Sequence, residues 1–264
     1  MFNLKKTTFA TVAAAIFLAG SGMSASAQEA ETPTGDLSIA MLSKYVWRGY
    51  ELSKDSLVIQ PSLTAAYKGF GFNLWGNLDT DQDMSLFGED GANWNETDMT
   101  LSYDNAVGMM SYSVGYIYYA LDSADDTQEL YGSISLDTIL APTLTIYRDF
   151  AEFPGWYSTL GVSHSFQLSA TISLDLGGHI SYMVVDDAST LADPNDPTSE
   201  YSDFHDGRIS ASISIPITDY LTVSPELYYS FALGSDASDV IKAASADGGD
   251  DNFIYGGVTL SMSF

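Results

Sequence analysis

The sequence predicts an all-β fold, a closed antiparallel transmembrane β-barrel of about twelve strands with short turns at one end and long acidic loops at the other. Three observations predict it. Apolar and small polar residues alternate along a dozen segments of strand length. Short and long connections alternate between these segments. Tyr and Trp gather near segment ends, where the aromatic girdles of membrane barrels lie.

In chain order, each expected strand shows this alternation, and the seventh is irregular around its Pro142 start. The expected strands are Leu37–Arg48, Leu57–Tyr67, Phe70–Leu78, Thr97–Tyr103, Met109–Tyr119, Glu129–Leu136, Thr143–Arg148, Trp156–Phe166, Ala170–Tyr182, Arg208–Ile217, Leu221–Phe231 and Phe253–Phe264. Links after even-numbered strands are short and lie around Lys68, Asn105, Thr138, Gln167 and Asp219. The long loops are Asp79–Glu96, Asp122–Gln128, Val184–Asp206 and Gly234–Asn252.

The first strand shows how parity assigns side chains to lipid or lumen. Its odd positions end in Tyr45 and Trp47, which we expect to face lipid near the outer interface. Lys44 and Arg48 have the opposite parity and are expected in the lumen, because a cation facing lipid near the midplane costs about 2–4 kcal/mol. Gly49 is expected to break the strand.

The N-terminus predicts export. Lys5 and Lys6 precede an apolar run too short to span a bilayer as a helix, and Ala25-Ser26-Ala27 provides small residues for cleavage. Residues 1–27 are therefore expected to be a cleaved signal peptide, residues 28–35 a short periplasmic segment, and residues 36–264 a barrel of the bacterial outer membrane.

Composition excludes several functions. With no cysteine, the chain has no disulfide or thiolate chemistry, and a formal charge of −26 makes nucleic acid an unlikely partner. No cofactor is expected. The three histidines (His164, His179 and His205) are scattered without ligand spacing, so no metal site is expected from them.

The predicted lumen is polar and carries charges of both signs. Its candidate functional residues are Lys44, Arg48, Arg208, Glu129, Asp175 and Glu226. The three cations facing the three acids would form a constriction whose transverse field orients polar solutes. Alternatively, the charges pair across a plugged lumen and only hold the sheet together. Many small inward residues leave room for a narrow pore, because twelve strands lie between a filled eight-stranded barrel and a wide sixteen-stranded porin.

The C-terminal strand supports a membrane barrel over a soluble sandwich, which would also alternate. Gly257, Leu260, Met262 and the terminal Phe264 resemble the signal read by the barrel-assembly machinery of Gram-negative bacteria. Since hydrocarbon cannot satisfy an unpaired strand edge, the first strand is expected to pair with the last.

One stretch carries a family resemblance. Ser43-Lys44-Tyr45-Val46-Trp47-Arg48-Gly49, followed by Ser53, Gln60–Leu63, Gly69–Phe72 and Leu74–Asn77, resembles the opening of TorF-type putative porins. The resemblance covers roughly Ser43–Asp79 and, more loosely, the strand rhythm to Phe264. It implies an outer-membrane barrel that acts as a porin without a settled substrate.

The expected function is passive diffusion of small hydrophilic solutes through a narrow polar lumen, with outer-membrane lipid and lipopolysaccharide around the barrel. Catalysis is not expected, because His164 is expected near a periplasmic turn, far from the outer leaflet where outer-membrane lipases work, and no lipase-like motif surrounds His205. The alternative is a structural or surface-binding barrel that acts through acidic loops, in which Asp193, Asp196, Asp247, Asp250 and Asp251 could bind Ca²⁺ without the regular loop signature.

Overall fold

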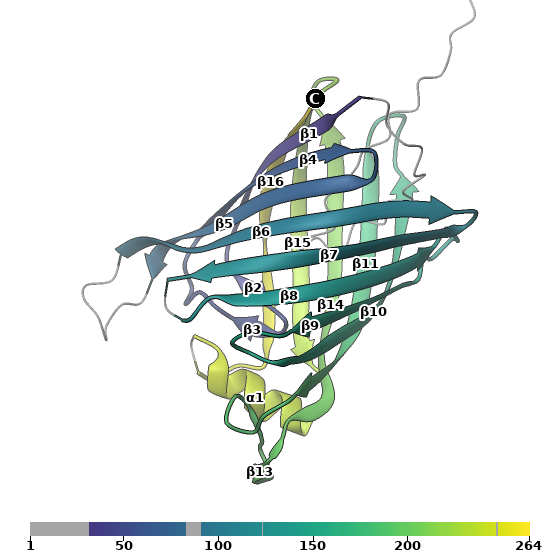
Figure 1. Cartoon of the computed structure of the whole chain (residues 1–264). Helices are drawn as coiled ribbons and strands as arrows, with labels where there is room; N and C mark the ends of the chain where they lie inside the picture. The colour runs from purple at the N-terminus through teal and green to yellow at the C-terminus, as the bar shows by residue number, and fades with distance from the viewer. Residues whose placement is uncertain (1–31, 83–90, 123, 247) are drawn as a thin grey trace, which may run out of the picture.

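The computed structural model describes residues 32–82, 91–122, 124–246 and 248–264. Within these residues, twelve antiparallel strands close into one barrel, which confirms the predicted fold class (Figure 1). The expected signal peptide and the first half of the periplasmic segment, residues 28–31, lie outside the described residues. In chain order the barrel strands are β1 (Thr34–Leu42), β4 (Val58–Tyr67), β5 (Phe70–Gln82), β6 (Gly91–Val107), β7 (Met110–Leu121), β8 (Thr127–Leu136), β9 (Thr143–Asp149), β10 (Gly155–Gln167), β11 (Ser173–Val185), β14 (Ser202–Pro216), β15 (Leu221–Ala232) and β16 (Asn252–Ser263).

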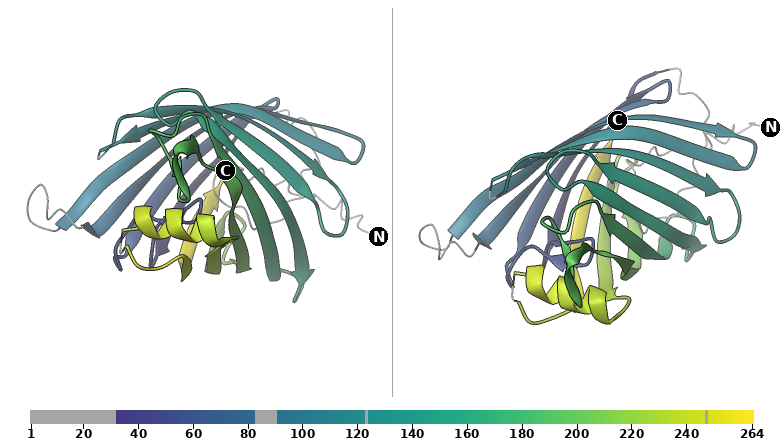
Figure 2. Two further views of the ribbon diagram at one scale, coloured as in Figure 1. Left: turned by 90° about the horizontal axis from the view of Figure 1, so that it is seen from below. Right: turned by 60° about the horizontal axis from the view of Figure 1, so that its bottom comes forward.

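The barrel has a turn end, which carries the C-terminus, and a loop end, which carries the longer connections. Two small hairpins and a helix lie among the connections that start from the loop end. They are β2 (Val46–Trp47) with β3 (Tyr50–Glu51), β12 (Ala192–Asp193) with β13 (Asp196–Glu200), and α1 (Ser235–Ala244). Figure 2 shows α1 at the loop end, beside the β2–β3 hairpin.

The first and last strands meet in the barrel wall, as the sequence predicts. Strand β1 pairs with β4 on one side and with β16 on the other, with Leu37 opposite Met262 and Ile39 opposite Leu260. Beyond this ladder, Gly35 and Phe264 exchange two backbone hydrogen bonds of 2.8 and 2.9 Å. No strand of the barrel is therefore left with an open edge in the described residues.

The outer surface of the barrel is apolar around its whole circumference. Each of the twelve strands exposes at least one large apolar side chain, for example Ile39, Leu63, Leu74, Leu101, Val114, Leu130, Leu144, Leu160, Ile180, Ile209, Leu227 and Leu260. A continuous apolar surface of this extent is not found on soluble monomers, whereas lipid covers it in a membrane-spanning barrel. The strands therefore cross a membrane.

Several strands extend beyond their predicted bounds. The expected loop Asp79–Glu96 is shorter, because β5 continues to Gln82 and β6 begins at Gly91. Strand β14 begins at Ser202 rather than Arg208, and β11 continues to Val185 rather than Tyr182, although it begins later, at Ser173 rather than Ala170. The extensions at the loop end are rich in polar residues. Where water reaches both faces of a strand, the alternation that marks its buried part is lost.

The first predicted strand is wrong in its second half. Strand β1 ends at Leu42, and the chain then leaves the barrel wall and enters the lumen as residues 43–57, called here the inner segment. Tyr45 is 6% exposed and packs inside the barrel, so Tyr45 and Trp47 do not face lipid. Alternation continues past Leu42 because this hairpin also sorts its side chains between two faces.

The helix α1 occupies part of the expected loop Gly234–Asn252. Ala237, Val240 and Ile241 are buried, and their spacing places them on one helical face. Asp236 in the first turn and Lys242 in the last turn suit the helix dipole. This short amphipathic pattern was the available sequence signal for α1. No helix in the described ranges is long and apolar enough to cross a membrane.

Candidate functional site in the barrel lumen

The inner segment turns back on itself at Arg48 and Gly49. Arg48 has a φ of 48° and Gly49 a φ of 84°, and Trp47 pairs with Tyr50 across this two-residue turn. Positive φ at both central residues is the geometry of the tightest β-hairpins. Gly49 therefore reverses the chain inside the lumen rather than ending a wall strand.

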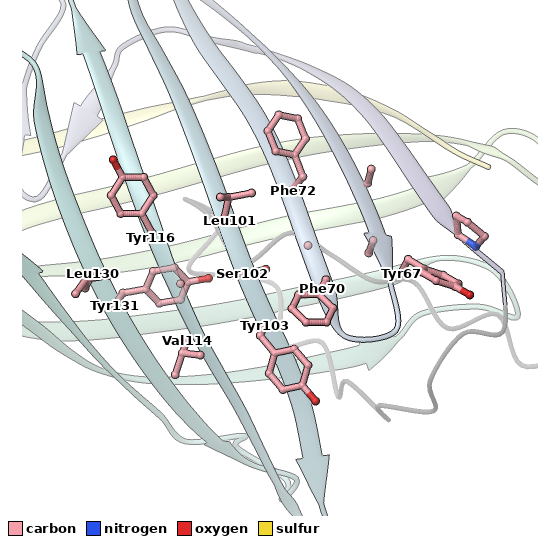
Figure 3. Close-up of a pocket in the computed structure, with 15 residues that line it drawn as sticks. Tyr67, Phe70, Phe72, Leu101, Ser102, Tyr103, Val114, Tyr116, Leu130 and Tyr131 are labelled. Atoms are coloured by element: carbon pink, nitrogen blue, oxygen red, sulfur yellow. The ribbon is translucent and has the colours of Figure 1, made fainter.

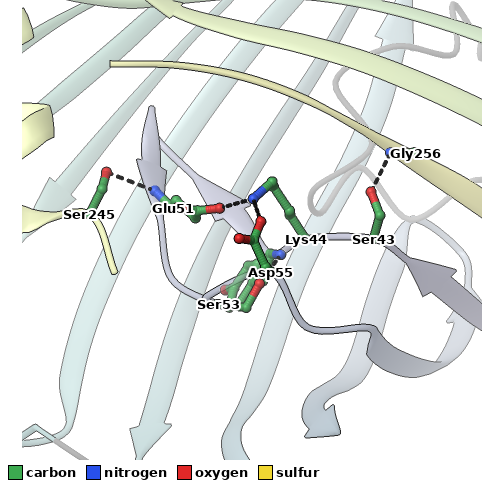
Figure 4. A network of polar contacts seen from close by, with 8 residues as sticks. Ser43, Lys44, Glu51, Ser53, Asp55, Ser245 and Gly256 are labelled. Atoms are coloured by element: carbon green, nitrogen blue, oxygen red, sulfur yellow. Dashed lines mark hydrogen bonds and ion pairs between the residues drawn. The ribbon is translucent and has the colours of Figure 1, made fainter. Parts of the chain in front are cut away.

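Backbone groups tie the inner segment to the loop end of the wall. Ser43 donates its N–H to the Gly256 carbonyl at 2.9 Å. The Glu51 N–H donates to Ser245 Oγ at 3.1 Å, and the Glu51 carbonyl accepts from the Ala246 N–H at 2.8 Å. These bonds hold the inner segment between β16 and the chain that follows α1 (Figure 4).

Lys44 forms its ion pairs within the inner segment. Its ammonium group pairs with Glu51, whose side chain is fully buried, and with Asp55 at 2.6 Å (Figure 4). Since both partners belong to residues 43–57, these contacts stabilise the folded form of the segment. In the described residues, Lys44 forms no ion pair with Glu129, Asp175 or Glu226.

Arg48 joins the inner segment to the opposite wall. Its guanidinium group donates to Glu129 Oε2 on β8 at 2.7 Å, and the same oxygen accepts from the Tyr119 hydroxyl at 2.8 Å. The guanidinium carbon lies 4.4 Å from the ring centroids of both Trp47 and Tyr157. Arginine suits this position because its planar group forms a charged hydrogen bond while it stacks on aromatic rings.

The backbone of Arg48 is held as well. The Arg48 carbonyl lies 3.0 Å from Nε2 of His205, and Nδ1 of the same ring lies 3.0 Å from the Tyr201 hydroxyl. Because a carbonyl only accepts, Nε2 must carry the proton, and Nδ1 then accepts from Tyr201. His205 is completely buried, so this neutral tautomer connects the turn to β14.

A second buried carboxylate lies next to this turn. Asp206 accepts from the Tyr157 hydroxyl at 2.8 Å and from Ser181 Oγ at 2.5 Å, and His179 lies 3.6 Å away. Asp206, Tyr119, Tyr157 and His205 were not among the predicted site residues. The inward parity of Tyr119 and Tyr157 was readable from the sequence, but the turn that they contact was expected in the wall. His205 and Asp206 fall in the expected loop Val184–Asp206, and these adjacent residues are both buried, close to a register shift between β11 and β14.

The remaining predicted charges lie on three neighbouring strands. Asp175 on β11 and Glu226 on β15 both pair in register with Ser212 on β14. Glu226 accepts from the Tyr228 hydroxyl at 2.8 Å, and the Arg208 guanidinium lies 5.5 Å from the Tyr228 ring centroid. On the wall, Arg208 of β14 lies between Asp175 of β11 and Glu226 of β15, so the structure does not place the three cations on one side and the three acids on the other.

The two ends of the lumen differ. At the loop end, the inner segment and α1 fill the space with a packed cluster that includes Tyr45, Val46 and Ile241. Toward the turn end, the inner wall has half-exposed small polar side chains, such as Ser111, Ser113 and Ser133. The inner segment and α1 thus narrow the lumen at the loop end, whereas the inner wall toward the turn end is polar and half-exposed.

The acidic loops do not assemble into a metal centre in the described residues. Asp193 and Asp196 cap their own turn, since they accept from the backbone N–H groups of Asn195 and Thr198 at 2.7 and 3.1 Å. Asp251 accepts from Ser238 in α1. Asp247 lies outside the described residues.

A separate groove of about 850 Å³ lies on the wall formed by β4 to β8 (Figure 3). It is lined mainly by outward apolar side chains, including Phe70, Leu101, Tyr103, Val114 and Leu130. Phe70 and Tyr103 contact each other with ring centroids 5.1 Å apart. This groove belongs to the surface that contacts lipid rather than to the lumen.

A closed twelve-stranded barrel with an apolar outer band and a charged lumen belongs to the class of outer-membrane β-barrels. Residues 26–149 match a family described as "Bacterial protein of unknown function (Gcw_chp)". That description assigns no activity, so the resemblance to TorF-type porins stays a prediction. A search of curated proteins finds no match.

Solved structures share the fold. The COG4313 outer membrane channel from Pseudomonas putida F1 is 11% identical, with a TM-score of 0.53, and the match covers 90% of this chain and 98% of that one. OmpT of Vibrio cholerae is 8% identical, with a TM-score of 0.39 and coverage of 88% and 97%. An anion-selective porin from Comamonas acidovorans is 10% identical, with a TM-score of 0.33 and coverage of 88% and 99%. Of these three structures, the Pseudomonas putida channel alone has a TM-score above 0.5, so the shared fold rests on that structure.

Proposed function

We propose that the protein is an outer-membrane channel for small hydrophilic solutes, and that the inner segment is its constriction. The observation that carries this proposal is the Arg48 contact with Glu129, which holds a short hairpin inside the lumen. The structural similarity to the outer membrane channel of Pseudomonas putida also supports it.

The inner segment is suited to set the size of a pore. Its β-ladder has only two residues in each strand, so side chains rather than a wide ladder hold it in place. Ion pairs and stacked rings can exchange partners without opening the barrel wall. Small polar side chains toward the turn end provide a wet path up to the constriction.

Conductance in planar lipid bilayers tests the proposal. The wild-type protein, Arg48→Ala and Lys44→Ala are compared, with heat-modifiable gel mobility as the measure of an intact barrel. We expect small wild-type currents and a larger or more frequent open state in Arg48→Ala, because the inner segment then loses its contact with β8. Lys44→Ala is expected to change the current less, since its ion pairs lie within the segment.

The absence of current above background from all three folded proteins would contradict the proposal. It would favour the alternative, a structural or surface-binding barrel in which the inner segment is a permanent plug. If the wild-type protein conducts, the ratio of cation to anion permeability under a salt gradient tests which class of solute passes.

A further inference from the structure

Two neighbouring carboxyl groups in the lumen have an environment unlike that of the other buried acids. Glu96 and Asp98 lie on the inner face of β6, and Asp98 is 1% exposed. Among the ion pairs of the described residues, none involves either of them. The Arg48 charge is already paired with Glu129, so it does not neutralise Asp98.

Five other acids of the lumen each have a donor. These pairs are Glu129 with Arg48, Glu51 with Lys44, Asp206 with Tyr157, Glu226 with Tyr228, and Asp175 with Ser173. Glu96 has the Tyr45 hydroxyl of the inner segment. For Asp98, both carboxylate oxygens lack a hydrogen-bond partner in the described residues, apart from the neighbouring Glu96 carboxyl, which can donate only if it is protonated.

Neutral oxygens without partners lie on the same wall. Thr100 Oγ1 and Asn73 Oδ1 are buried and unpartnered, and Thr100 pairs directly with Asn73 across the β5–β6 ladder. The Asn73 amide nitrogen donates to Ser62 and Thr64 at 2.8 and 2.9 Å, which fixes its orientation and leaves the oxygen as a free acceptor. The wall therefore presents several oxygen atoms that lack donors.

The negative charge of the two buried carboxyl groups must be neutralised by a bound proton or a cation. Burying an ionised carboxylate without a partner costs several kcal/mol, and two adjacent carboxylates repel each other. Either the two carboxyl groups share a proton or a cation lies between them. A shared proton satisfies the two acids alone. A cation bound at Asp98 also has neutral oxygens beside it, because Thr100 is the next inward residue of β6 and Asn73 pairs with Thr100.

We propose that the inner face of β5 and β6 is a binding site for a hard divalent cation of the calcium type. Glu96 and Asp98 supply two negative charges, and Thr100 and Asn73 supply neutral oxygens. Calcium accepts mixed oxygen ligands in flexible geometry, whereas magnesium demands a near-ideal octahedron that a sheet wall does not provide. Tyr45, which contacts Glu96 and packs on Trp75 with ring centroids 5.6 Å apart, makes the site a support for the inner segment.

The proposal is tested by binding in detergent, which does not depend on conductance. The folded barrel is stripped with a chelator, and calcium binding is measured by calorimetry and by the temperature of the heat-modifiable gel transition. We expect a saturable rise in that temperature with Ca²⁺ and a much smaller rise with Mg²⁺ or Na⁺, because a cation that binds only the folded state stabilises it.

Asp98→Asn and Asp175→Asn form a matched pair of variants. Asp175 is also a buried lumen acid, but it has Ser173 as a donor. We expect Asp98→Asn to weaken Ca²⁺ affinity at least tenfold and to raise the transition temperature in chelator, because it removes an unpaired charge. Asp175→Asn is expected to keep the wild-type response.

Three results overturn the proposal. An unchanged Ca²⁺ response in Asp98→Asn assigns the binding to the acidic loops. No wild-type response to Ca²⁺, together with stability that falls as the pH rises through neutrality, shows that the two carboxyl groups share a proton. An equal response to Na⁺ excludes a divalent site.

Discussion

Arg48 and Glu129 are 81 positions apart in sequence, yet their side chains form a 2.7 Å ion pair inside the barrel. The two side chains are 11% and 1% exposed. Together they connect a hairpin that begins at β1 to the strand on the far side of the lumen. Removing one partner of such a buried pair typically costs about 3–5 kcal/mol, because the other charge is left unpaired.

Arg48→Lys tests whether charge alone holds the inner segment. Lysine keeps the positive charge but cannot place a planar group between Trp47 and Tyr157. We expect Arg48→Lys to lower the unfolding temperature and to raise the current nearly as much as Arg48→Ala does. A variant indistinguishable from wild type would mean that the aromatic contacts contribute nothing. Glu129→Gln, measured alongside, should resemble Arg48→Ala.

Gly49→Ala tests the turn of the inner segment. A Cβ at Gly49 would lie 2.9 Å from Asp206 Cβ and 2.9 Å from Ile241 Cδ1, and the φ of 84° is itself unfavourable for alanine. Gly108 is a matched control, because it has a φ of 65° but no atom within 4 Å of the position that a Cβ would take. We expect Gly108→Ala to cost only about 1–2 kcal/mol of backbone strain.

Thermal unfolding of the two glycine variants gives the comparison. Gly49→Ala should lose clearly more stability than Gly108→Ala, because it also displaces α1 from the turn. Equal losses would show that steric contact with Asp206 and Ile241 is relieved without cost.

Phe264→Ala tests the closure of the barrel and the expected assembly signal. A Cβ built at Gly35 would lie 2.5 Å from the Phe264 ring, so this ring covers the first strand. We expect Phe264→Ala to slow the appearance of the heat-resistant barrel, both in lipid vesicles and with the assembly machinery. Phe166→Ala removes another exposed aromatic ring of the turn end and should fold at the wild-type rate. A defect only with the machinery would separate recognition from packing.

The lowered pKa of Asp251 predicts that the stability of α1 at the loop end depends on pH. The Ser238 hydroxyl, together with Asn252 and Lys242, lowers the pKa of the Asp251 carboxyl from 3.8 to about 2. A carboxyl with a lowered folded-state pKa contributes stability above pH 3.8 that is lost as the pH falls toward 2. The protection of the α1 amides, measured as hydrogen exchange relative to the intrinsic rate at each pH, should therefore fall over that range.

Asp251→Asn is the control for this effect. It removes the titrating group, so the wild-type protein and the variant should converge as the pH approaches 2 and differ above about pH 4, where wild-type α1 is better protected. A difference that persists unchanged to the lowest pH would contradict a role for ionised Asp251.

The sequence was informative about the barrel wall and much less so about the lumen. Twelve strands, their order along the chain and the pairing of the first with the last were predicted, because alternation between lipid and lumen is a local pattern. At the loop end, strands such as β6 extend beyond that pattern, since water reaches both faces there. The inner segment was misplaced, because Tyr45 and Trp47 alternate in a lumen hairpin as they would in a wall strand.

By itself, the sequence determined which residues could share a face, because neighbouring side chains of an extended chain point to opposite sides. Only the tertiary structure decided that β1 ends at Leu42 and that Arg48 meets Glu129. It also decided that, in the described residues, the neighbouring Glu96 carboxyl is the one hydrogen-bond partner of the Asp98 carboxyl. These contacts depend on how strands that are distant in sequence are arranged around one lumen. Local alternation carries no information about that distance across the barrel.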